Sequence, residues 1–321
     1  MEQIQRVIYV ADDTHYQSFW PYMSLIIKHV FQAEPVMFRL SSWMEETDWE
    51  PSFGGMMKVI RGLPDVPLSI QAQCYRVFGA REFPDDVCML SDIDMFSLRS
   101  DHYNKYLSGT DQNDLVLLGS DCYDLTRQEV ARNLGVNDIR QFVGTGDGVL
   151  CNATRFPICY LIGRGGVFKQ LVDSWGDNWS TYIRNVYNHY NPSDQRNAAR
   201  DTDEVHISDT IINYDHGLNV VCKPRGYSSN FYLTDRIEKN KWVSDAWINK
   251  LMCNFYASSE DHDCKSQDDF PVTGTFCLDT TSHIVYDNFM DIHVPDNGSI
   301  PYIARLILDY YGHEHVDIPP P

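Results

Sequence analysis

The sequence predicts an α/β protein built on a mostly parallel central sheet flanked by helices. Short apolar runs of strand length alternate with helical segments through the first half, which is the pattern of successive β–α units. Several of these runs stop at acidic residues, as strands do where they reach the edge of a sheet. No internal repeat and no linker rich in Gly, Ser or Pro divides the 321 residues, so we expect one domain over residues 1–321.

The first strand is expected at residues 7–10, where an apolar run stops at Ala11. A helix should follow, because apolar side chains recur at helical spacing between residues 19 and 30. Residues 36–40 predict a second strand. Residues 41–61 have no clear period, and we expect a loop with a short helix there.

The remaining helices and strands are predicted from the same kinds of pattern, apolar residues at helical spacing and short apolar runs of strand length. The later helices are expected at residues 69–78, 166–187, 203–213 and 300–311. The later strands are expected at residues 87–90, 114–119, 148–152, 158–162, 218–222, 284–286 and 291–293. Residues 234–271 are polar and charged and predict no element.

Charge and composition exclude several classes of protein. The net charge of −19 argues against nucleic acid as a partner, because a duplex binder needs a basic surface. No apolar run approaches the roughly 20 residues of a membrane span, and the amino-terminal residues lack the pattern of a signal peptide. The nine cysteines include no C-x-x-C pair, so we expect neither a zinc knuckle nor a disulfide framework. These features predict a cytoplasmic location.

The most informative motif is Asp92-x-Asp94, which directly follows the apolar run at residues 87–90. Two carboxylates two residues apart at the end of a strand can reach one hard divalent cation, which is often shared with substrate phosphates. In α/β proteins ligands bind outside the carboxyl ends of the strands, so the motif favours nucleotide chemistry. Acids at such positions also cap turns and helices, which remains the alternative.

Three further segments carry candidate ligands, each with a structural alternative. Asp12, Asp13 and Thr14 lie where the first strand meets its helix, and they either cap that helix or contact a nucleoside. Arg76 lies in an otherwise apolar helix and is either a solvated side chain or a planar donor for phosphate or sugar oxygens. Asp147, in a glycine-rich stretch, either binds sugar hydroxyls or belongs to a plain turn.

Asp203 and Glu204 open a predicted helix, where acids stabilise the helix dipole by default. The alternative is that one carboxylate of the pair takes a proton from a substrate as a general base. Trp175 and Trp179 lie one helical turn apart in an aromatic stripe. We expect the stripe to be mostly core, with an acceptor-sugar platform as the alternative.

Six short motifs occur in the order that a known family shows. They are Ala11-Asp12-Asp13-Thr14, Ala72-x-x-x-Arg76, Asp92-x-Asp94, Gly148-Val-Leu-Cys-Asn152, Asp203-Glu204 and Asp291-x-His293. This order resembles the GT-A glycosyltransferases, most closely the retaining galactosyl- and glucosyltransferases of the glycogenin and lipopolysaccharide type. The resemblance covers most of residues 6–300. It implies a Rossmann-like GT-A fold with a nucleotide-binding half at about residues 1–120 and an acceptor-binding half, with the carboxyl-terminal metal ligand, at about 121–321.

The resemblance also implies roles for these residues. Ala11, Asp12, Asp13, Thr14, Arg76, Asp92 and Asp147 would bind a donor such as a UDP-sugar. Asp92, Asp94 and His293 would bind Mn²⁺ or Mg²⁺, and the imidazole favours Mn²⁺. Asp203 and Glu204 would be the catalytic pair.

The sequence departs from the family at two places. The family follows its histidine with a Lys-Pro that holds the donor diphosphate, but no lysine follows His293 here, and Arg305 or Arg225 are the candidate substitutes. Glu204 stands where the family has Gln, so an inverting base is possible there, although the resemblance favours retention.

The leading hypothesis is therefore a metal-dependent glycosyltransferase that moves a sugar from a nucleoside diphosphate, expected to be UDP, to a glycan hydroxyl. One alternative is a sugar nucleotidyltransferase, which needs a glycine-rich loop after the first strand, where Ala11-Asp12-Asp13-Thr14 has no glycine. The other alternative is a non-enzymatic carbohydrate-binding protein on the same scaffold. The sequence does not predict the sugar, the acceptor or the oligomeric state.

Overall fold

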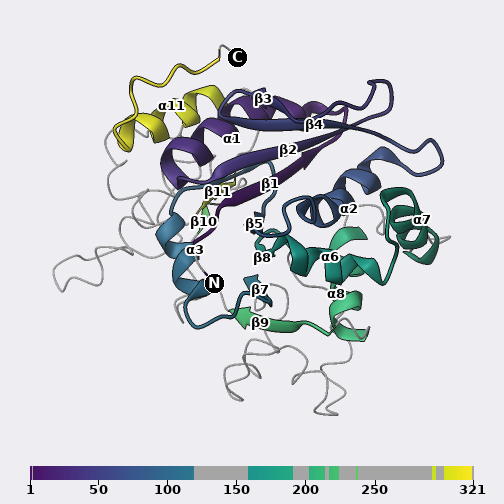
Figure 1. Ribbon diagram of the computed structural model, residues 1–321. Coiled ribbons are helices and arrows are strands. Elements are labelled where there is room, and N and C mark those ends of the chain that lie inside the picture. Colours follow the sequence, from purple (N-terminus) through teal and green to yellow (C-terminus); the bar gives the residue numbers. More distant parts are fainter. Residues whose placement is uncertain are drawn as a thin grey trace, which may run out of the picture.

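The computed structural model describes residues 1, 3–118, 158–190, 202–213, 217–223, 236–237, 291–293 and 300–319. Two of the expected strands, at residues 148–152 and 284–286, lie outside these ranges, as do Asp147 and Arg225. The sequence prediction of a mostly parallel sheet flanked by helices is confirmed over the described part of the chain (Figure 1).

The main sheet has eight strands in the order β3-β4-β2-β1-β5-β8-β7-β9. Its strands are β1 (Arg6–Ala11), β2 (Glu34–Ser41), β3 (Glu50–Ser52), β4 (Gly55–Arg61), β5 (Val87–Leu90), β7 (Asp114–Leu118), β8 (Leu161–Arg164) and β9 (Asn219–Lys223). Four of the seven pairings are parallel and three are antiparallel. A second sheet, in the order β10-β11-β6, joins β6 (Met95–Ser97), β10 (Arg236–Ile237) and β11 (Asp291–His293).

Helices cover both faces of the main sheet (Figure 1). The α-helices are α1 (Trp20–Ile26), α2 (Leu68–Ala80), α3 (Ser100–Leu107), α6 (Gly165–Asp173), α7 (Trp179–Tyr190), α8 (Thr202–Asn213) and α11 (Ile300–Tyr310). A 3-10 helix, His15–Phe19, precedes α1, and a π-helical turn, Ile27–Phe31, follows it. Helices α1 and α11 pack together over one face, whereas α2, α6, α7 and α8 pack over the other.

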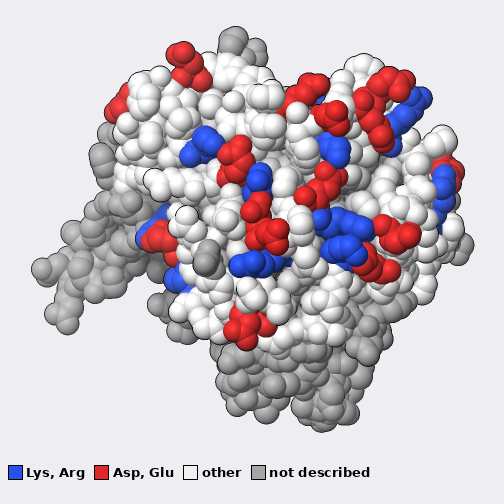
Figure 2. All heavy atoms as spheres, in the orientation of Figure 1, with Lys and Arg blue, Asp and Glu red and all other residues white. Residues whose placement is uncertain are grey.

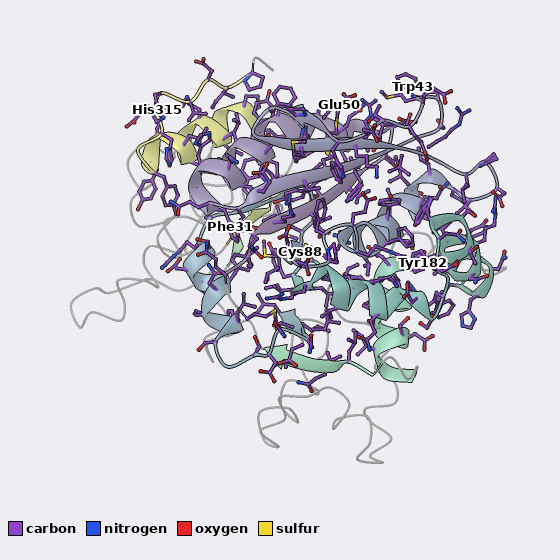
Figure 3. All side chains as sticks on the ribbon, in the orientation of Figure 1. Phe31, Trp43, Glu50, Cys88, Tyr182 and His315 are labelled. Carbon is purple, nitrogen blue, oxygen red and sulfur yellow. The ribbon has the colours of Figure 1, made fainter. Side chains whose placement is uncertain are left out.

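The alternation of side chains along the strands produces two separate cores. In β5, Val87 and Met89 point to the face covered by α1 and α11, whereas Cys88 and Leu90 point to the face covered by α2. Both sets are buried, which is why β5 reads in the sequence as a continuous apolar run. Figure 3 labels one large side chain in each core, Phe31 and Tyr182.

Some of the elements predicted from the sequence differ from those in the structure. The single helix expected at residues 166–187 is two helices, α6 and α7. The break contains Gly176, which has a φ of 158°, and a Cβ there would lie 2.6 Å from the backbone nitrogen of Tyr182. A glycine in the left-handed region ends the helical repeat that the aromatic stripe suggests.

The loop with a short helix expected at residues 41–61 contains the hairpin of β3 and β4 instead. Strand β4 runs parallel to β2, and Gly55 permits its close approach, since a Cβ there would lie 2.2 Å from the carbonyl oxygen of Pro35. Half-buried Met56, Met57 and Lys58 follow one another along β4, so the strand shows no alternation in the sequence. The strand-like stretch expected at residues 158–162 also shifts, because β8 begins at Leu161.

Candidate active site

The site lies where two neighbouring parallel strands end. Strand β1 pairs with β5 so that Ile8 lies opposite Leu90, and the amide of Ser91 donates to the carbonyl of Ile8 at 3.2 Å. The segments after both strands therefore meet at one edge of the sheet, where an open pocket of about 330 Å³ is found. Its lining comes from the end of β1, from the segments that follow β1 and β5, and from one side of α2: Val10, Ala11, Asp12, Tyr16, Ser69, Ala72, Gln73, Arg76, Ser91, Asp92, Ile93 and Asp94.

The carboxylate of Asp12 fixes the turn that leaves β1. Asp12 is 8% exposed, and its Oδ1 accepts hydrogen bonds from the amide and the hydroxyl of Thr14. This is a local turn that satisfies the backbone where the chain enters the 3-10 helix. Thr14 is exposed and is not part of the pocket lining. Thr14 is the N-cap residue of the 3-10 helix but makes no side-chain capping hydrogen bond, and Asp12 also reaches the pocket.

Asp13 ties the end of β1 to the end of β2. Its Oδ2 accepts hydrogen bonds from the amide of Ser42 at 2.8 Å and from the Ser42 hydroxyl at 2.9 Å. Partial burial alone would raise the pKa of Asp13, but these hydrogen bonds, one from Ser41 and the charge of Arg39 outweigh it and lower the pKa. Its Oδ1 is buried without a hydrogen-bond partner among the described residues, because Arg39 Nη2 is 3.9 Å away.

Arg76 connects two acids from distant parts of the chain. Its guanidinium donates from Nη1 to Asp92 Oδ1 and from Nη2 to Asp203 Oδ2, the second at 2.5 Å. The side chains of Arg76 and Asp203 are 11% and 4% exposed, whereas that of Asp92 is 38% exposed. The structure thus brings three of the predicted site residues into contact. The sequence prediction did not anticipate that the arginine would hold the acids directly.

The ion pairs govern the protonation of the cluster. Burial alone would lower the pKa of Arg76. The charges of Asp92 and Asp203 outweigh burial and raise this pKa above its usual value, so the guanidinium remains charged. Burial raises the pKa of Asp203, and the guanidinium opposes that effect. One cation thus faces two carboxylates in a half-enclosed site.

Helix α8 is anchored to α2 at its first turn. The amide of Thr202 donates to Gln73 Oε1 at 3.2 Å, one residue before the Arg76–Asp203 contact. The amide of Glu204 donates to Asp203 Oδ1 at 2.8 Å, so Asp203 also satisfies the helix terminus. Glu204 is half-buried and is not among the residues that line the pocket.

The backbone of His293 lies beside the D-x-D motif. The chain turns after Asp92, with the Met95 amide donating to the Asp92 carbonyl at 3.1 Å, and enters β6. Strand β11 pairs with β6 in antiparallel register, and His293 lies opposite Met95, the residue after Asp94. This pairing brings together segments about two hundred positions apart. Among the residues whose side chains are described, no three His, Cys, Asp or Glu side chains are grouped to hold a metal.

Arg305, one of the two candidate substitutes for the family's lysine, has other partners. Its guanidinium donates to the carbonyls of Val316 at 2.8 Å and His313 at 2.9 Å and pairs with Asp309. These bonds fasten the segment after α11 to the helix, so Arg305 is not free to hold a diphosphate. Figure 2 shows acidic and basic side chains interspersed on the face in view.

Several pocket residues were missed by the sequence reasoning. Ser69, Gln73 and Arg76 lie on the same face of α2, because Gln73 follows Ser69 by four residues and precedes Arg76 by three. That helical spacing was the signal that could have found Ser69 and Gln73. Tyr16 lies two residues after the first motif and was given no role. Ile93, the middle residue of the D-x-D, carried no signal.

The aromatic stripe belongs to the core. Trp175 is 6% exposed, and its indole N–H donates to Thr210 Oγ1 at 2.9 Å. Trp179 packs against Tyr75, with ring centroids 4.5 Å apart. The two tryptophans therefore do not form the exposed platform that an acceptor sugar would need.

Comparisons with known proteins return structural likenesses alone. No protein-family model matches the chain, and no curated protein matches it. The chain is similar to the galactosyltransferase LgtC solved with donor and acceptor sugar analogues, at 14% identity over 98% of both chains with a TM-score of 0.41. It is similar to the glycosyltransferase GlyE of Streptococcus pneumoniae, at 10% identity over 97% of this chain and 60% of that one, with a TM-score of 0.38.

A third likeness is to the bifunctional glycosyltransferase WbbM, at 9% identity over 98% of this chain and 52% of that one, with a TM-score of 0.41. At such low identities and TM-scores these likenesses do not identify an activity or a site. The case for function therefore rests on the residues of this chain. As for membranes, none of the described helices has both the length and the apolar character that a membrane span requires.

Proposed function

We propose that the protein is a metal-dependent glycosyltransferase that uses a nucleoside diphosphate sugar, with UDP as the nucleotide, and a glycan hydroxyl as the acceptor. The observation that carries the proposal is the single pocket at the ends of β1 and β5, which gathers Asp12, Arg76, Asp92 and Asp94 from three separate segments. Its position outside the carboxyl ends of parallel strands is where α/β proteins bind nucleotides.

The residues present fit a divalent cation. Asp92 and Asp94 both line the pocket, Asp92 is 38% exposed at its side chain, and the backbone of His293 lies next to Asp94. We assign Asp92, Asp94 and His293 as the metal ligands. Oxygen ligands with one imidazole suit Mn²⁺ and, less well, Mg²⁺. When bound, such a cation neutralises the charge that develops on a departing diphosphate.

The chain's own residues would hold the rest of the donor. Asp13 is the proposed acceptor for a ring N–H such as that of uracil, because its Oδ1 has no hydrogen-bond partner among the described residues and only a 3.9 Å ion pair with Arg39. Asp203 is fixed by Arg76 close to the pocket, where a carboxylate can bind sugar hydroxyls or stabilise positive charge at the anomeric carbon. Asp147 is proposed as a further hydroxyl ligand.

Titration calorimetry of UDP with and without Mn²⁺ tests the proposal. We expect UDP to bind in the presence of Mn²⁺ and to bind at least about tenfold more weakly without it. UDP binding that ignores the metal, or no UDP binding, would overturn it. A sugar nucleotidyltransferase would instead bind a nucleoside triphosphate more tightly than UDP, and a carbohydrate-binding protein would bind a glycan without either nucleotide.

The stereochemical outcome is a separate part of the proposal, and we favour retention. The proposal of retention rests on the resemblance to retaining families, and Glu204, the candidate inverting base, is half-buried and does not line the pocket. A panel of UDP-sugars scored by hydrolysis identifies the donor, and the anomeric coupling in the proton NMR spectrum of the transfer product gives the outcome. An inverted product together with an inactive Glu204→Gln variant would make Glu204 the base.

A further inference from the structure

The charges that line the pocket are unbalanced. Among its described lining residues, Asp12, Asp92 and Asp94 are acids, and Arg76 is the one cation. Asp203 lies directly behind Arg76 and adds a fourth carboxylate to the cluster. An anionic diphosphate would meet net negative charge here, so cationic charge must be supplied or redistributed before it can bind.

Arg76 is held differently at its two ends. The Nη2 end contacts Asp203, which is 4% exposed at its side chain and further fixed by the Glu204 amide. The Nη1 end contacts Asp92, which is 38% exposed and lies on the pocket side. A buried ion pair is costly to break because it leaves an uncompensated charge, whereas an exposed one contributes little. The Asp92 contact is therefore the one that can open.

A divalent cation and Arg76 compete for the same carboxylate. The Oδ1 atom of Asp92 is occupied by the guanidinium, and a cation bound to Asp92 would also repel that guanidinium. We propose that Arg76 is a positioning residue that holds Asp92 in the metal-free protein, releases it when Mn²⁺ binds, and remains anchored on Asp203 with its Nη1 end turned to the donor. This inference rests on the proposed function, because it requires the metal at Asp92.

The inference predicts opposite effects of one substitution on two ligands. A lysine at position 76 keeps the positive charge but cannot bridge two carboxylates, because it lacks the planar fork of arginine. Arg76→Lys should therefore bind Mn²⁺ roughly tenfold more tightly than wild type in the absence of nucleotide. The same variant should bind UDP-sugar more weakly at saturating Mn²⁺, since lysine lacks the second N–H group that arginine would turn to the UDP-sugar.

Nucleotide-free Mn²⁺ binding is measured by electron paramagnetic resonance of the free ion, on the full chain. The matched control is Arg81→Lys, at the end of the same helix, where the arginine contacts Asp173 and the carbonyl of Asp177 and not the pocket. The control should keep wild-type affinity for Mn²⁺. If Arg76→Lys binds Mn²⁺ with wild-type affinity or more weakly while wild type binds Mn²⁺ and UDP, the inference is wrong and the proposed function stands.

If wild type binds no Mn²⁺, both the inference and the metal dependence fail. Should Arg76→Lys not fold, a crystal structure of the wild-type protein with Mn²⁺ decides. The inference expects the Arg76–Asp92 contact to be open and the Arg76–Asp203 contact to be intact. A structure with Mn²⁺ on Asp92 and the arginine still bonded to both acids would overturn it.

Discussion

Asp203 and His206 lie one turn apart on α8, and both are buried polar residues, but their surroundings differ. Asp203 shares one guanidinium with Asp92 and lies beside an open pocket. His206 is fully buried, and its Nε2 lies 2.9 Å from the Tyr182 hydroxyl and its Nδ1 3.4 Å from the Thr210 hydroxyl. The Trp175 ring packs edge-on against it, with centroids 4.8 Å apart.

The difference separates a site from a core. Around His206 every polar ring atom has a partner and the cluster is closed by aromatic rings, as is usual for buried polar groups that specify packing. Around Asp203 the carboxylates outnumber the guanidinium, so charge remains to be balanced by a ligand. Helix α8 thus contributes Asp203 to the candidate site from its first turn and His206 to the core from the following turn.

The largest expected effect lies at the pocket end of this comparison. Asp94→Asn and Asp92→Asn should each abolish Mn²⁺-dependent UDP binding and reduce transfer by at least about 100-fold, because a neutral amide is a poor ligand for a hard cation. His293→Ala should weaken metal binding by a smaller factor. Calorimetry and transfer assays measure these effects, with circular dichroism as the check on folding. A His293→Ala variant with wild-type activity at limiting Mn²⁺ would remove the third ligand.

Asp203→Asn sharpens the comparison on α8 itself. The buried guanidinium of Arg76 loses a counter-charge, and the amide cannot accept from both Arg76 and the Glu204 amide, so we expect a loss of about 3 kcal/mol in the free energy of unfolding. Transfer should fall by about 100-fold, because the carboxylate charge near the pocket is lost. A variant that loses stability but keeps its turnover would place Asp203 with His206 in the core.

His206→Gln should keep near wild-type transfer, unlike Asp203→Asn. We expect it to lose roughly 2 kcal/mol of the free energy of unfolding at pH 7. Burial and the nearby His189 lower the pKa of His206 to about 3, so it is neutral in the folded state. The unfolded chain takes up this proton below about pH 6.5, so wild type loses about 1.4 kcal/mol per pH unit from there towards pH 3.

Glutamine does not titrate, so the stability gap between His206→Gln and wild type should close as the pH falls. Urea unfolding of both proteins at pH 7 and pH 5 measures it. A gap that stays constant would mean that His206 is not held neutral by its cluster.

The smallest effect is expected at Asp13. Asp13→Ala removes the two hydrogen bonds from Ser42, which should cost about 1 kcal/mol of stability. If the Oδ1 of Asp13, which has no hydrogen-bond partner among the described residues, accepts from the uracil ring, UDP affinity should also fall by roughly tenfold. Ser42→Ala is the control, because it weakens the same tie without removing the carboxylate. Equal UDP affinity in both variants would restrict Asp13 to a structural role.

The first half of the fold could be predicted because its signals are local. Strand β5 is buried on both faces and reads as an apolar run, and its end at Asp92 marks the sheet edge. Helix α2 shows its buried face through Ile70, Cys74 and Val77 at helical spacing. The hairpin of β3 and β4 gave no such signal, because the edge strand β3 is mostly exposed, three successive side chains of β4 are half-buried, and the close approach of β4 to β2 depends on Gly55.

The candidate site could be predicted only as separate residues. Motif spacing pointed to Arg76, Asp92 and Asp203, but it could not show that one guanidinium contacts both acids, since that contact depends on how α2 and α8 pack. The pairing of β11 with β6 is likewise a tertiary fact, and it places the His293 backbone beside Asp94. Asp147 lies outside the described residues, so its place at the site remains a prediction.

The position of the metal is the central claim, and paramagnetic broadening by Mn²⁺ tests it most directly. With UDP present and Mn²⁺ added in small amounts to the labelled protein, we predict that the amide signals of Ser91, Asp94 and His293 broaden first. As a comparison region we take the histidines His29, His313 and His315, whose successive ring centroids are 5.4 and 6.0 Å apart and which are not grouped to hold a metal. Broadening that begins there, while the signals of Ser91 and Asp94 persist, would contradict the account.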